Sequence, residues 1–324
     1  MGKKALVPAS IHVAELIPTN KRESLVAWFN LYLTLEGAAG SPNTLDAKKR
    51  DLGHFLSFFL AATGGDHPDQ WTRSLTAHYL RQLVRGERKS PTTVNRRLAT
   101  LRHTANWVHR QRPFLAGNPC SRIHDLDVDD PEWKGLSDIE VTRLKSAAEQ
   151  LIHIDRRRNQ TPVRDFAIFL VLLHTGLRIS ELLELDLDQY QGKHCVNVKR
   201  KGKKVTRKVF LAKDARESLD RYIDNVRSTR PGPLVASRAG KRLARQNVDD
   251  ALKRIAKQAN ARLPQDQQIH LSAHLLRHTM LRKAAEKYGV QYAMELAGHT
   301  SSRYIWRYIQ PSQKQKEAAL EDLF

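Results

Sequence analysis

Two arginines, two histidines and a tyrosine in the C-terminal half of the chain have types and a spacing suited to chemistry on a phosphodiester. Arg178 lies in HTGLRISELLEL, and His274 and Arg277 lie in AHLLRHT. His299 and Tyr308 follow in LAGHTSSRYIWRYIQ, nine residues apart. Each motif alone is weak, because HxxRH also occurs by chance in basic helices. Together and in this order they predict a site that binds a phosphodiester and attacks it with a tyrosine.

Metal-free cleavage of a phosphodiester needs a nucleophile, cations on the non-bridging oxygens and an acid for the leaving 5′-oxygen. Arg178 and Arg277 suit the second task, because a guanidinium donates two hydrogen bonds to a phosphate and keeps its charge. For Arg178 the alternative is a structural ion pair with Glu181 or Glu184. The sequence therefore predicts a phosphate site with two fixed cations.

The segment AHLLRHT is expected to be helical, with Ser272 as its N-cap. His274 and Arg277 are three residues apart, so both reach one side of the helix and one phosphate. His278 completes a spacing that zinc ligands also use, but zinc proteases carry Glu after the first histidine, where this chain has Leu275. We expect no metal, and we interpret His278 as a buried structural histidine that donates to the backbone.

The acid is expected among the basic residues 199–208, KRKGKKVTRK, seven of which are lysine or arginine. Such a run is by default a solvated or phosphate-tracking hairpin. A lysine at its tip can nevertheless reach the leaving oxygen and protonate it. Composition alone leaves Lys199, Lys201, Lys203 and Lys204 open.

Two tyrosines compete for the role of nucleophile. Tyr304 and Tyr308 follow His299 by five and nine residues. A phenol with a pKa of about 10 is a weak nucleophile, so the arginines would have to stabilise the charge that develops on its oxygen. The alternative for both is aromatic packing with Trp306.

The length of 324 residues indicates two domains, and the charge indicates a polyanionic partner. Fifty-five basic against 34 acidic residues give a net charge of +21, yet residues 125–132, DLDVDDPE, hold five acidic residues and none that are basic. We predict a helical DNA-clamp domain over residues 1–124, an acidic linker over 125–135 and a catalytic domain over 136–324. Two basic bodies on a non-basic linker suit closure around a duplex.

The first domain is predicted to contain four helices, which include residues 25–35, 41–60, 75–84 and 90–108. SPNT and SPTT begin the second and fourth of them, each with a serine N-cap and a proline at the first helical position. Polar groups near such N-termini can contact phosphates, although a solvated helix face is the simpler interpretation. The candidates for DNA contact are Asn43, Thr44, Lys48, Thr92, Asn95 and Arg96.

The second domain is predicted to be mostly helical with a small antiparallel sheet. Ser137 and Glu140 form a capping box, and an apolar helix covers residues 163–174. Gly176 should end that helix in the left-handed conformation, which places Arg178 on a turn before a second helical segment over 179–185. Residues 195–200 and 204–211 read as paired strands, and helical periodicity returns from Leu219.

Other classes of protein fit poorly. The longest apolar run, residues 166–173, is far short of the ~20 residues of a membrane span, and the first ten residues lack the apolar stretch of a signal peptide. We therefore expect a cytoplasmic, nucleoid-associated protein without a membrane partner. Cys120 and Cys195 are expected to be reduced packing residues.

These motifs make the chain resemble the tyrosine recombinase family (phage integrase, Xer and Cre) over residues 20–315. The resemblance implies a SAM-like four-helix core-binding domain and a mixed α/β catalytic domain. Its K-G-x-K hairpin assigns the acid to Lys201, and its spacing assigns the nucleophile to Tyr308. The full catalytic set that it implies is Arg178, Lys201, His274, Arg277, His299 and Tyr308.

The chain departs from the family pattern at a few positions. Arg200 stands where glycine is usual, Met280-Leu281 replaces Phe-Ala, and RYIW replaces a serine- and threonine-rich stretch before the tyrosine. Further DNA contacts are expected from Lys199, Arg200, Lys203, Arg242 and Arg245.

The resemblance implies a site-specific recombinase that works through a 3′-phosphotyrosine and a Holliday junction, in integration, excision or resolution. It implies double-stranded DNA with paired inverted half-sites as the partner and a tetramer joined by the tail, residues 312–324, acting in trans. No cofactor is expected, because the covalent link conserves the bond energy and the chain has no Walker motif. The alternatives are a type IB topoisomerase-like enzyme and a non-catalytic DNA-binding protein.

Overall fold

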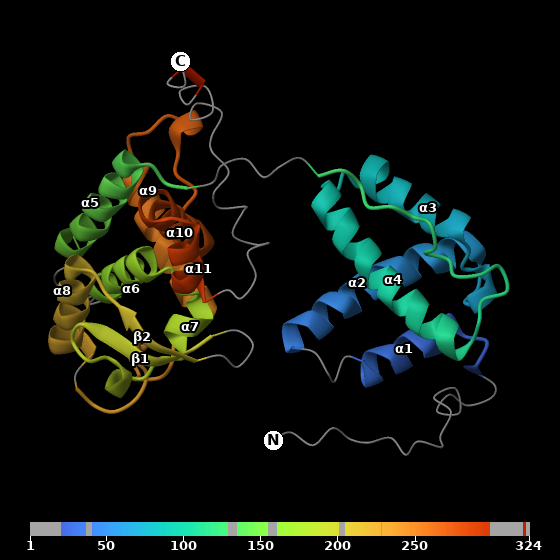
Figure 1. Ribbon diagram of the computed structural model, residues 1–324, viewed down its shortest axis with the longest axis horizontal. Coiled ribbons are helices and arrows are strands. Elements are labelled where there is room, and N and C mark those ends of the chain that lie inside the picture. Colours follow the sequence, from blue (N-terminus) through green and yellow to red (C-terminus); the bar gives the residue numbers. More distant parts are fainter. Residues whose placement is uncertain are drawn as a thin grey trace. The chain divides into compact units, whose positions relative to one another are not determined.

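The computed structural model describes residues 21–36, 41–128, 135–154, 161–200, 205–227, 229–298 and 320–321. The chain divides into two compact units, Met1–Asp130 and Pro131–Phe324 (Figure 1). This division falls inside the segment 125–135. Both units are largely helical, and the described residues contain one two-stranded antiparallel sheet. The expected fold class is confirmed.

The described residues of the N-terminal unit form four α-helices, as predicted. They are α1 (Leu25–Leu35), α2 (Pro42–Thr63), α3 (Arg73–Arg81) and α4 (Pro91–Gln111). Ser41 and Ser90 are the N-caps of α2 and α4, and their hydroxyl oxygens accept from the backbone N–H of Thr44 and Thr93. The third helix begins earlier than expected, at Arg73 after the N-cap Thr72, and continues past Arg81 as a π-helical turn, η5 (Gln82–Gly86).

The core of the N-terminal unit is aromatic. The indole of Trp107 on α4 contacts the rings of Trp28 and Tyr32 on α1 edge-on, at centroid distances of 6.2 and 5.6 Å. Phe55 of α2 is fully buried and lies 5.0 Å from the ring of Trp71. Large rings that pack edge to face or at a tilt thus hold α1 against α4, and α2 against the segment that carries Trp71.

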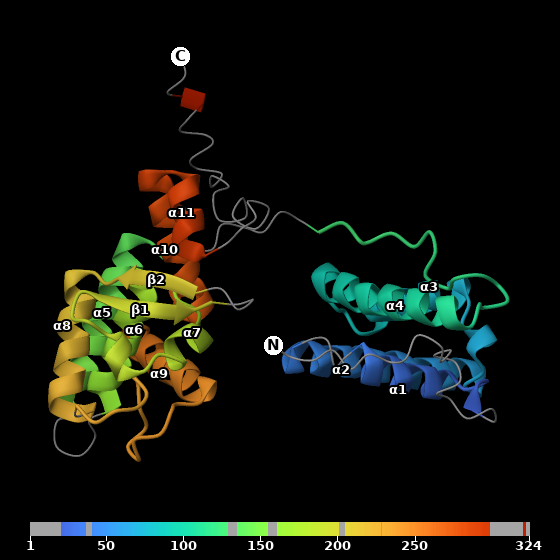
Figure 2. The ribbon, with the colours of Figure 1, turned by 60° about the horizontal axis from the view of Figure 1, so that its bottom comes forward.

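The C-terminal unit, Pro131–Phe324, is built around one buried helix, α6, and is called the catalytic unit below because the sequence predicts the catalytic residues there. Its packing partners are α5, α8, α9 and α10, and ten of its 15 residues are buried (Figure 2). The helices of this unit are α5 (Asp138–Ile154), α6 (Thr161–Thr175), α7 (Ile179–Leu183), α8 (Lys213–Tyr222), α9 (Arg245–Ala259), α10 (Ala273–Tyr288) and α11 (Val290–Ala297), with short turns η6 (Leu187–Gln189), η7 (Ile223–Arg227) and η8 (Gln265–Gln267). An element that is apolar on all sides in this way serves as the core on which the others are positioned.

The predicted hairpin is formed by β1 (His194–Lys199) and β2 (Val205–Phe210), paired from His194 opposite Phe210 to Lys199 opposite Val205. Its inward residues on β1 are Cys195 and Val198, three apart rather than two. Asn197 between them has a positive φ of 51°, and the side-chain amide of Gln189 donates to the carbonyls of Val196 and Asn197. This local turn of the backbone explains the departure from strict alternation.

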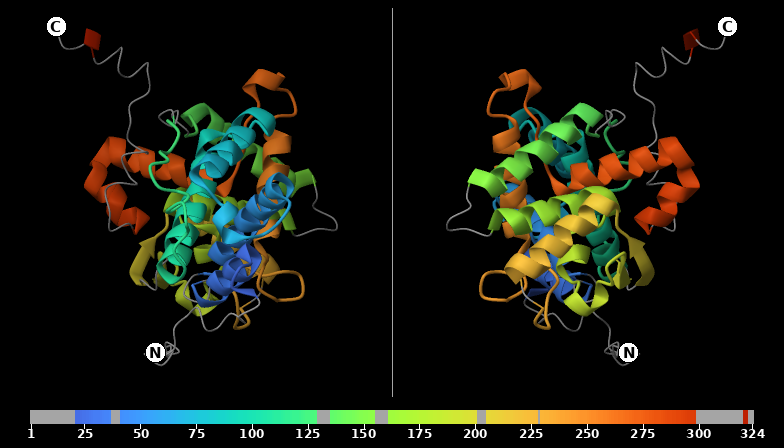
Figure 3. Two further views of the ribbon diagram at one scale, coloured as in Figure 1. Left: turned by 90° about the vertical axis from the view of Figure 1, so that its right-hand side faces the viewer. Right: turned by 90° about the vertical axis from the view of Figure 1, so that its left-hand side faces the viewer.

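A small separate cluster holds α11 against the C-terminal half of α10 (Figure 3). Leu281 and Ala285 of α10 pack there with Ala293 and Ala297 of α11. Within the part of the chain that the structure describes, no helix combines the length and the apolar character needed to cross a membrane. The tail, 312–324, lies outside the described residues apart from 320–321.

Candidate active site

The turn between α6 and α7 presents Arg178. Gly176 has φ +60°, and a Cβ built on it would lie 3.1 Å from Sδ of Met280 on α10. Glycine is therefore required here both by the left-handed backbone and by the close approach of α10. Arg178 follows in an extended conformation as the N-cap of α7, as the sequence predicted.

The carboxylate of Glu181 fixes Arg178 from the first turn of α7. It accepts from the backbone N–H of Arg178 at 3.0 Å and from Nη1 of Arg178 at 2.7 Å. The ion pair considered as an alternative is therefore present, yet the Arg178 side chain remains 31% exposed. Burial raises the pKa of Glu181, but the Arg178 N–H and the charges of Arg200 and Arg178 outweigh burial and leave that pKa below its usual value.

Arg277 joins α10 to this turn. Ser272 caps α10 as predicted, and Arg277 in the second turn is 3% exposed. Nη1 of Arg277 donates to the carbonyl of Gly176, and Nη2 donates to the carbonyl of Ala297 at 2.8 Å. Arg277 and the Arg178 turn are thus brought together although they are about a hundred residues apart in sequence.

His274 lies one turn before Arg277 and is exposed. Its pKa is lowered by partial burial first and then by the positive charges of Arg277, Arg178 and Arg245. These three arginines therefore act on one imidazole, and at neutral pH that imidazole is uncharged. The ring of His278 meets that of His274 edge-on at 4.1 Å between centroids. His278 is half-buried rather than buried, which corrects that expectation.

Arg200 directly follows β1 and points inward. Its side chain is 4% exposed, and Nη1 donates to Oε2 of Glu181 at 2.8 Å. This corrects the expectation that Arg200 contacts DNA, because its guanidinium is used inside the protein. The basic composition of residues 199–208 hid this role, and the only signal was an arginine at a position where glycine is usual.

Three members of the expected catalytic set, Lys201, His299 and Tyr308, lie outside the described residues, as do Lys203 and Tyr304. The residues directly before the first two are described. Arg200 contacts Glu181, and Gly298 ends α11 in the left-handed conformation.

The candidates for DNA contact in the N-terminal unit fall into two groups. Asn43, Thr44 and Thr92 are exposed in the first turns of α2 and α4. The other three make contacts within the unit. Nζ of Lys48 donates to the hydroxyl of Tyr32 at 2.7 Å, the Asn95 amide pairs with the backbone of Leu126, and Arg96 binds both oxygens of the buried Asp51 carboxylate.

The remaining candidates belong to the catalytic unit. Lys199 is exposed at the end of β1, and Arg245 is 79% exposed at the start of α9, where its charge reaches His274. Arg242 donates to the carboxylate of Asp186 at 2.6 Å and to the carbonyl of Leu183.

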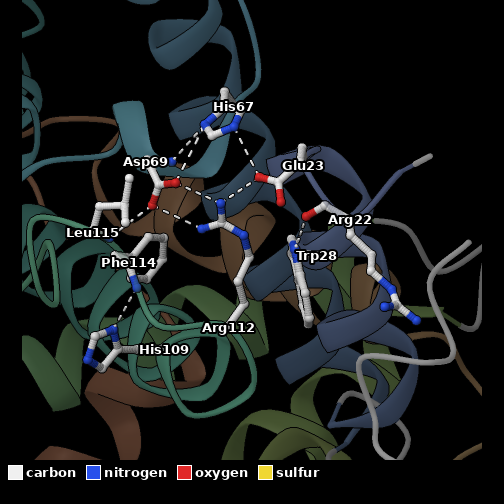
Figure 4. Close-up of polar contacts among 9 residues, drawn as sticks. All are labelled: Arg22, Glu23, Trp28, His67, Asp69, His109, Arg112, Phe114 and Leu115. Atoms are coloured by element: carbon white, nitrogen blue, oxygen red, sulfur yellow. Dashed lines mark hydrogen bonds and ion pairs between the residues drawn. The ribbon is translucent and has the colours of Figure 1, made fainter. Parts of the chain in front are cut away.

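A cluster of Glu23, His67 and Asp69 in the N-terminal unit has ligand atoms within 4.8 Å of one another. The guanidinium of Arg112 lies among them and binds Asp69 at 2.7 Å and Glu23 at 2.5 Å (Figure 4). A cation therefore already lies between these carboxylates, so we interpret the cluster as an ion-pair network that ties the start of α1 to the end of α4.

Two family models match the chain. The phage integrase family matches residues 143–315, and the phage integrase N-terminal SAM-like domain matches residues 27–112. Among curated relatives, tyrosine recombinase XerD of Listeria monocytogenes serotype 4b is 28% identical, over 83% of this chain and 89% of its own length. Tyrosine recombinase XerC of Alcanivorax borkumensis is 30% identical, over 80% of each chain.

Solved structures share the fold. The Tn1549 transposon integrase in complex with a circular intermediate DNA has a TM-score of 0.70 at 15% identity, covering 93% of this chain and 100% of that one. A lambda integrase tetramer bound to a Holliday junction has a TM-score of 0.69 at 15% identity, covering 92% and 84%. Since the integrase model alone matches more than half of the residues, the chain belongs to the phage integrase family and is a site-specific tyrosine recombinase.

Proposed function

We propose that this recombinase cuts and rejoins DNA through Tyr308. The phenolic oxygen of Tyr308 attacks the scissile phosphorus, the bond from phosphorus to the 5′-oxygen breaks, and a 3′-phosphotyrosine and a free 5′-hydroxyl result. Attack by a 5′-hydroxyl of the partner DNA reverses the step and exchanges the strands. One bond is made for each one broken, so no energy source is consumed.

The observation that carries the proposal is the convergence of Arg178, His274 and Arg277. Arg277 is bonded to the turn that presents Arg178, and both charges lower the pKa of His274. Glu181, the carboxylate that binds Arg178, also binds Arg200, so Arg178, Arg200 and Glu181 together keep one positive charge in excess. An excess of fixed positive charge beside a neutral imidazole suits the two negative oxygens of a phosphodiester transition state.

Each group then has one task. Arg178 and Arg277 bind the non-bridging oxygens, while His274 and His299 hydrogen-bond the phosphate. Lys201 protonates the leaving 5′-oxygen, and a cation that approaches this oxygen also favours its departure.

The partner we propose is double-stranded DNA with paired inverted half-sites, bound by a tetramer. The net charge of +21 and the DNA-bound and tetrameric neighbours in structure support this. We further propose that the tail, residues 312–324, docks on a neighbouring protomer. Deletion of 316–324 should leave half-site binding intact and remove cooperative binding of a second protomer. Unchanged cooperativity on full sites would exclude the tail as the coupling element.

A nicked suicide substrate tests the nucleophile. We expect the wild type to be trapped covalently on DNA and Tyr308→Phe to bind equally well without being trapped, because that change removes one oxygen and no charge. Tyr304→Phe is the matched control and should still be trapped. The opposite pattern would move the nucleophile to Tyr304. Recombinant joints between two sites separate recombination from nicking and resealing.

A substrate with sulfur as the leaving 5′ atom tests the acid. Thiols have a pKa near 8.5 and leave without a proton donor, so sulfur should restore cleavage by Lys201→Ala. Lys203→Ala and Lys204→Ala should mainly weaken binding and reduce its salt dependence. Lys201→Ala that stays slow on the sulfur substrate would remove Lys201 from the acid role.

A further inference from the structure

We infer that Arg200 is a positioning residue. It links the phosphate-binding arginine Arg178 to the hairpin that carries Lys201 and to the end of α11, which directly precedes His299. This inference rests on the proposed function of those three residues. Arg200 itself touches neither substrate nor nucleophile in this account, and it acts through the groups that it holds.

Four segments of the catalytic unit meet at this one side chain. Arg200 directly follows β1, its Nη1 donates to Glu181 of α7 at 2.8 Å, and its Nε donates to the hydroxyl of Thr206 on β2 at 3.0 Å. Its Nη2 lies 3.5 Å from the carbonyl of Leu296 on α11. A Cβ built on Gly298 would be 3.6 Å from Cγ, Cδ and Nε of Arg200, so the side chain lies directly against the end of α11.

Burial separates Arg200 from the other basic residues of its segment. Of the four that are described within 199–208, Lys199, Arg207 and Lys208 are exposed and Arg200 is buried. Removing a guanidinium from water is unfavourable unless its donors find partners. Here three donors face partners on three different segments, which only the planar fork of arginine can supply.

Charge gives a second reason for an arginine at this position. Glu181 alone would neutralise Arg178, and the pair would then attract a phosphate weakly. Arg200 binds the other oxygen of the same carboxylate, because Arg178 Nη1 contacts Oε1 and Arg200 Nη1 contacts Oε2. With Arg200 present, Glu181 can hold Arg178 in place while the three side chains together keep one positive charge in excess.

Chain continuity extends this link to the two catalytic residues outside the described part. Lys201 is bonded to Arg200, and His299 is bonded to Gly298, against which Arg200 packs. Consecutive Cα atoms are about 3.8 Å apart, so fixing Arg200 and Gly298 fixes the points from which both residues start. Arg200 is therefore placed to fix the starting point of the proposed acid, Lys201, relative to Arg178.

The test compares Arg200→Met and Arg200→Lys with the wild type on nicked suicide duplexes that carry either oxygen or sulfur as the leaving 5′ atom. We expect Arg200→Met to slow covalent capture on the oxygen substrate about 100-fold, within the range of a lost general acid. On the sulfur substrate the loss should be about 10-fold or less. Half-site binding should stay within about threefold, and Arg200→Lys should recover part of the rate because it restores the charge.

The matched control is Arg254→Lys, which alters an arginine on another buried carboxylate, Asp165, in the same unit. Covalent capture by this variant should be as fast as that of the wild type on both substrates. Thr206→Val removes only the contact to Nε of Arg200. It should also lose more cleavage rate on the oxygen than on the sulfur substrate, by a smaller factor, and it serves as the test if Arg200→Met fails to fold.

Equal losses on the oxygen and sulfur substrates, or no loss on either, would overturn the positioning role. If the wild type cleaves and Arg200→Met shows equal losses or no loss, this inference alone is overturned. A wild type that is never trapped on DNA overturns the proposed function as well.

Discussion

Two buried carboxylates in the catalytic unit each bind two arginines, yet they serve different ends. Asp165 on α6 pairs with Arg164 at 2.9 Å and with Arg254 on α9 at 2.5 Å. Glu181 on α7 pairs with Arg178 at 2.7 Å and with Arg200 at 2.8 Å. Both carboxylates are less than 5% exposed. The local chemistry of the two clusters is therefore nearly the same.

What differs is the set of segments that each cluster joins. Asp165 ties α6 to α9, and Arg164 also faces the carbonyl of Ala236. The Glu181 cluster joins a turn, a hairpin and, through Arg200, the end of α11. It lies beside a histidine whose pKa is lowered first by burial and then by Arg277, Arg178 and Arg245. An ion-pair cluster becomes part of an active site when its arginines lie beside further cations and a titratable group such as His274, and it is otherwise a structural clamp.

The largest expected effect is that of Arg277→Ala. It removes a buried cation and the hydrogen bonds to Gly176 and Ala297, so cleavage should fall about 1,000-fold or more. Covalent capture on a nicked substrate at saturating protein measures this. Arg277 is bonded to the turn that presents Arg178, and Arg254→Ala in the Asp165 cluster is the comparison, which should keep cleavage near the wild-type rate. An Arg254→Ala protein as inactive as Arg277→Ala would show that the Asp165 cluster also belongs to the active site.

The second prediction exchanges each carboxylate for its neutral amide. Glu181→Gln and Asp165→Asn should both lower the free energy of unfolding by about 3 kcal/mol, since each leaves two arginines without their countercharge. Only Glu181→Gln should also slow cleavage, by about 10- to 100-fold, because Arg178 loses its orientation. Denaturant unfolding and covalent capture on the same preparations separate the two effects. Cleavage that falls equally in both variants would contradict the comparison.

Local signals in the sequence predicted much of this fold. Serine caps, Pro91 and Gly176 act on backbone within a few residues of themselves, so the helix starts and the Arg178 turn could be read directly. The helix over residues 41–60 was predicted, but the burial of its single apolar residues does not follow from helical periodicity alone. Leu60 is 40% exposed, whereas Phe58 is 9% exposed because it packs on Phe55 and Tyr79. Side-chain packing of this kind depends on partners that helical periodicity does not specify.

The site was predicted in its residue types but not in its internal contacts. Arg178, His274 and Arg277 do lie together, as their motifs indicated. The role of Arg200 could not be read, because its partners lie 19 residues earlier, at Glu181, and 96 residues later, at Leu296. A basic run carries no information on which of its members is buried.

The third and smallest prediction concerns Asp69, a carboxylate in the N-terminal unit that belongs to neither the Asp165 nor the Glu181 cluster. The hydrogen bond from Arg112 lowers the pKa of Asp69 from 3.8 to about 2. This pair therefore stabilises the folded state above about pH 4, and that stabilisation is lost as the pH falls towards 2. Relative to the wild type, Asp69→Asn should be destabilised by about 1–2 kcal/mol at pH 6. The difference should shrink between about pH 4 and 2, with cleavage at neutral pH unchanged.

Denaturant unfolding of both proteins across this range of pH measures the difference. A gap that stays constant from pH 6 to 2 would show that the Arg112 pair contributes nothing that depends on charge. A loss of cleavage in folded Asp69→Asn would place this network in the reaction rather than in the support of the N-terminal unit.

Identification of the residue that becomes linked to DNA is the most direct test of the account. The wild type is trapped on a nicked suicide duplex, the DNA is digested to a short remnant, and the modified peptide is sequenced by mass spectrometry. We predict that the remnant is attached through its 3′-phosphate to Tyr308. A remnant on Tyr304, or on any residue other than Tyr308, would contradict the proposed arrangement of nucleophile, arginines and acid.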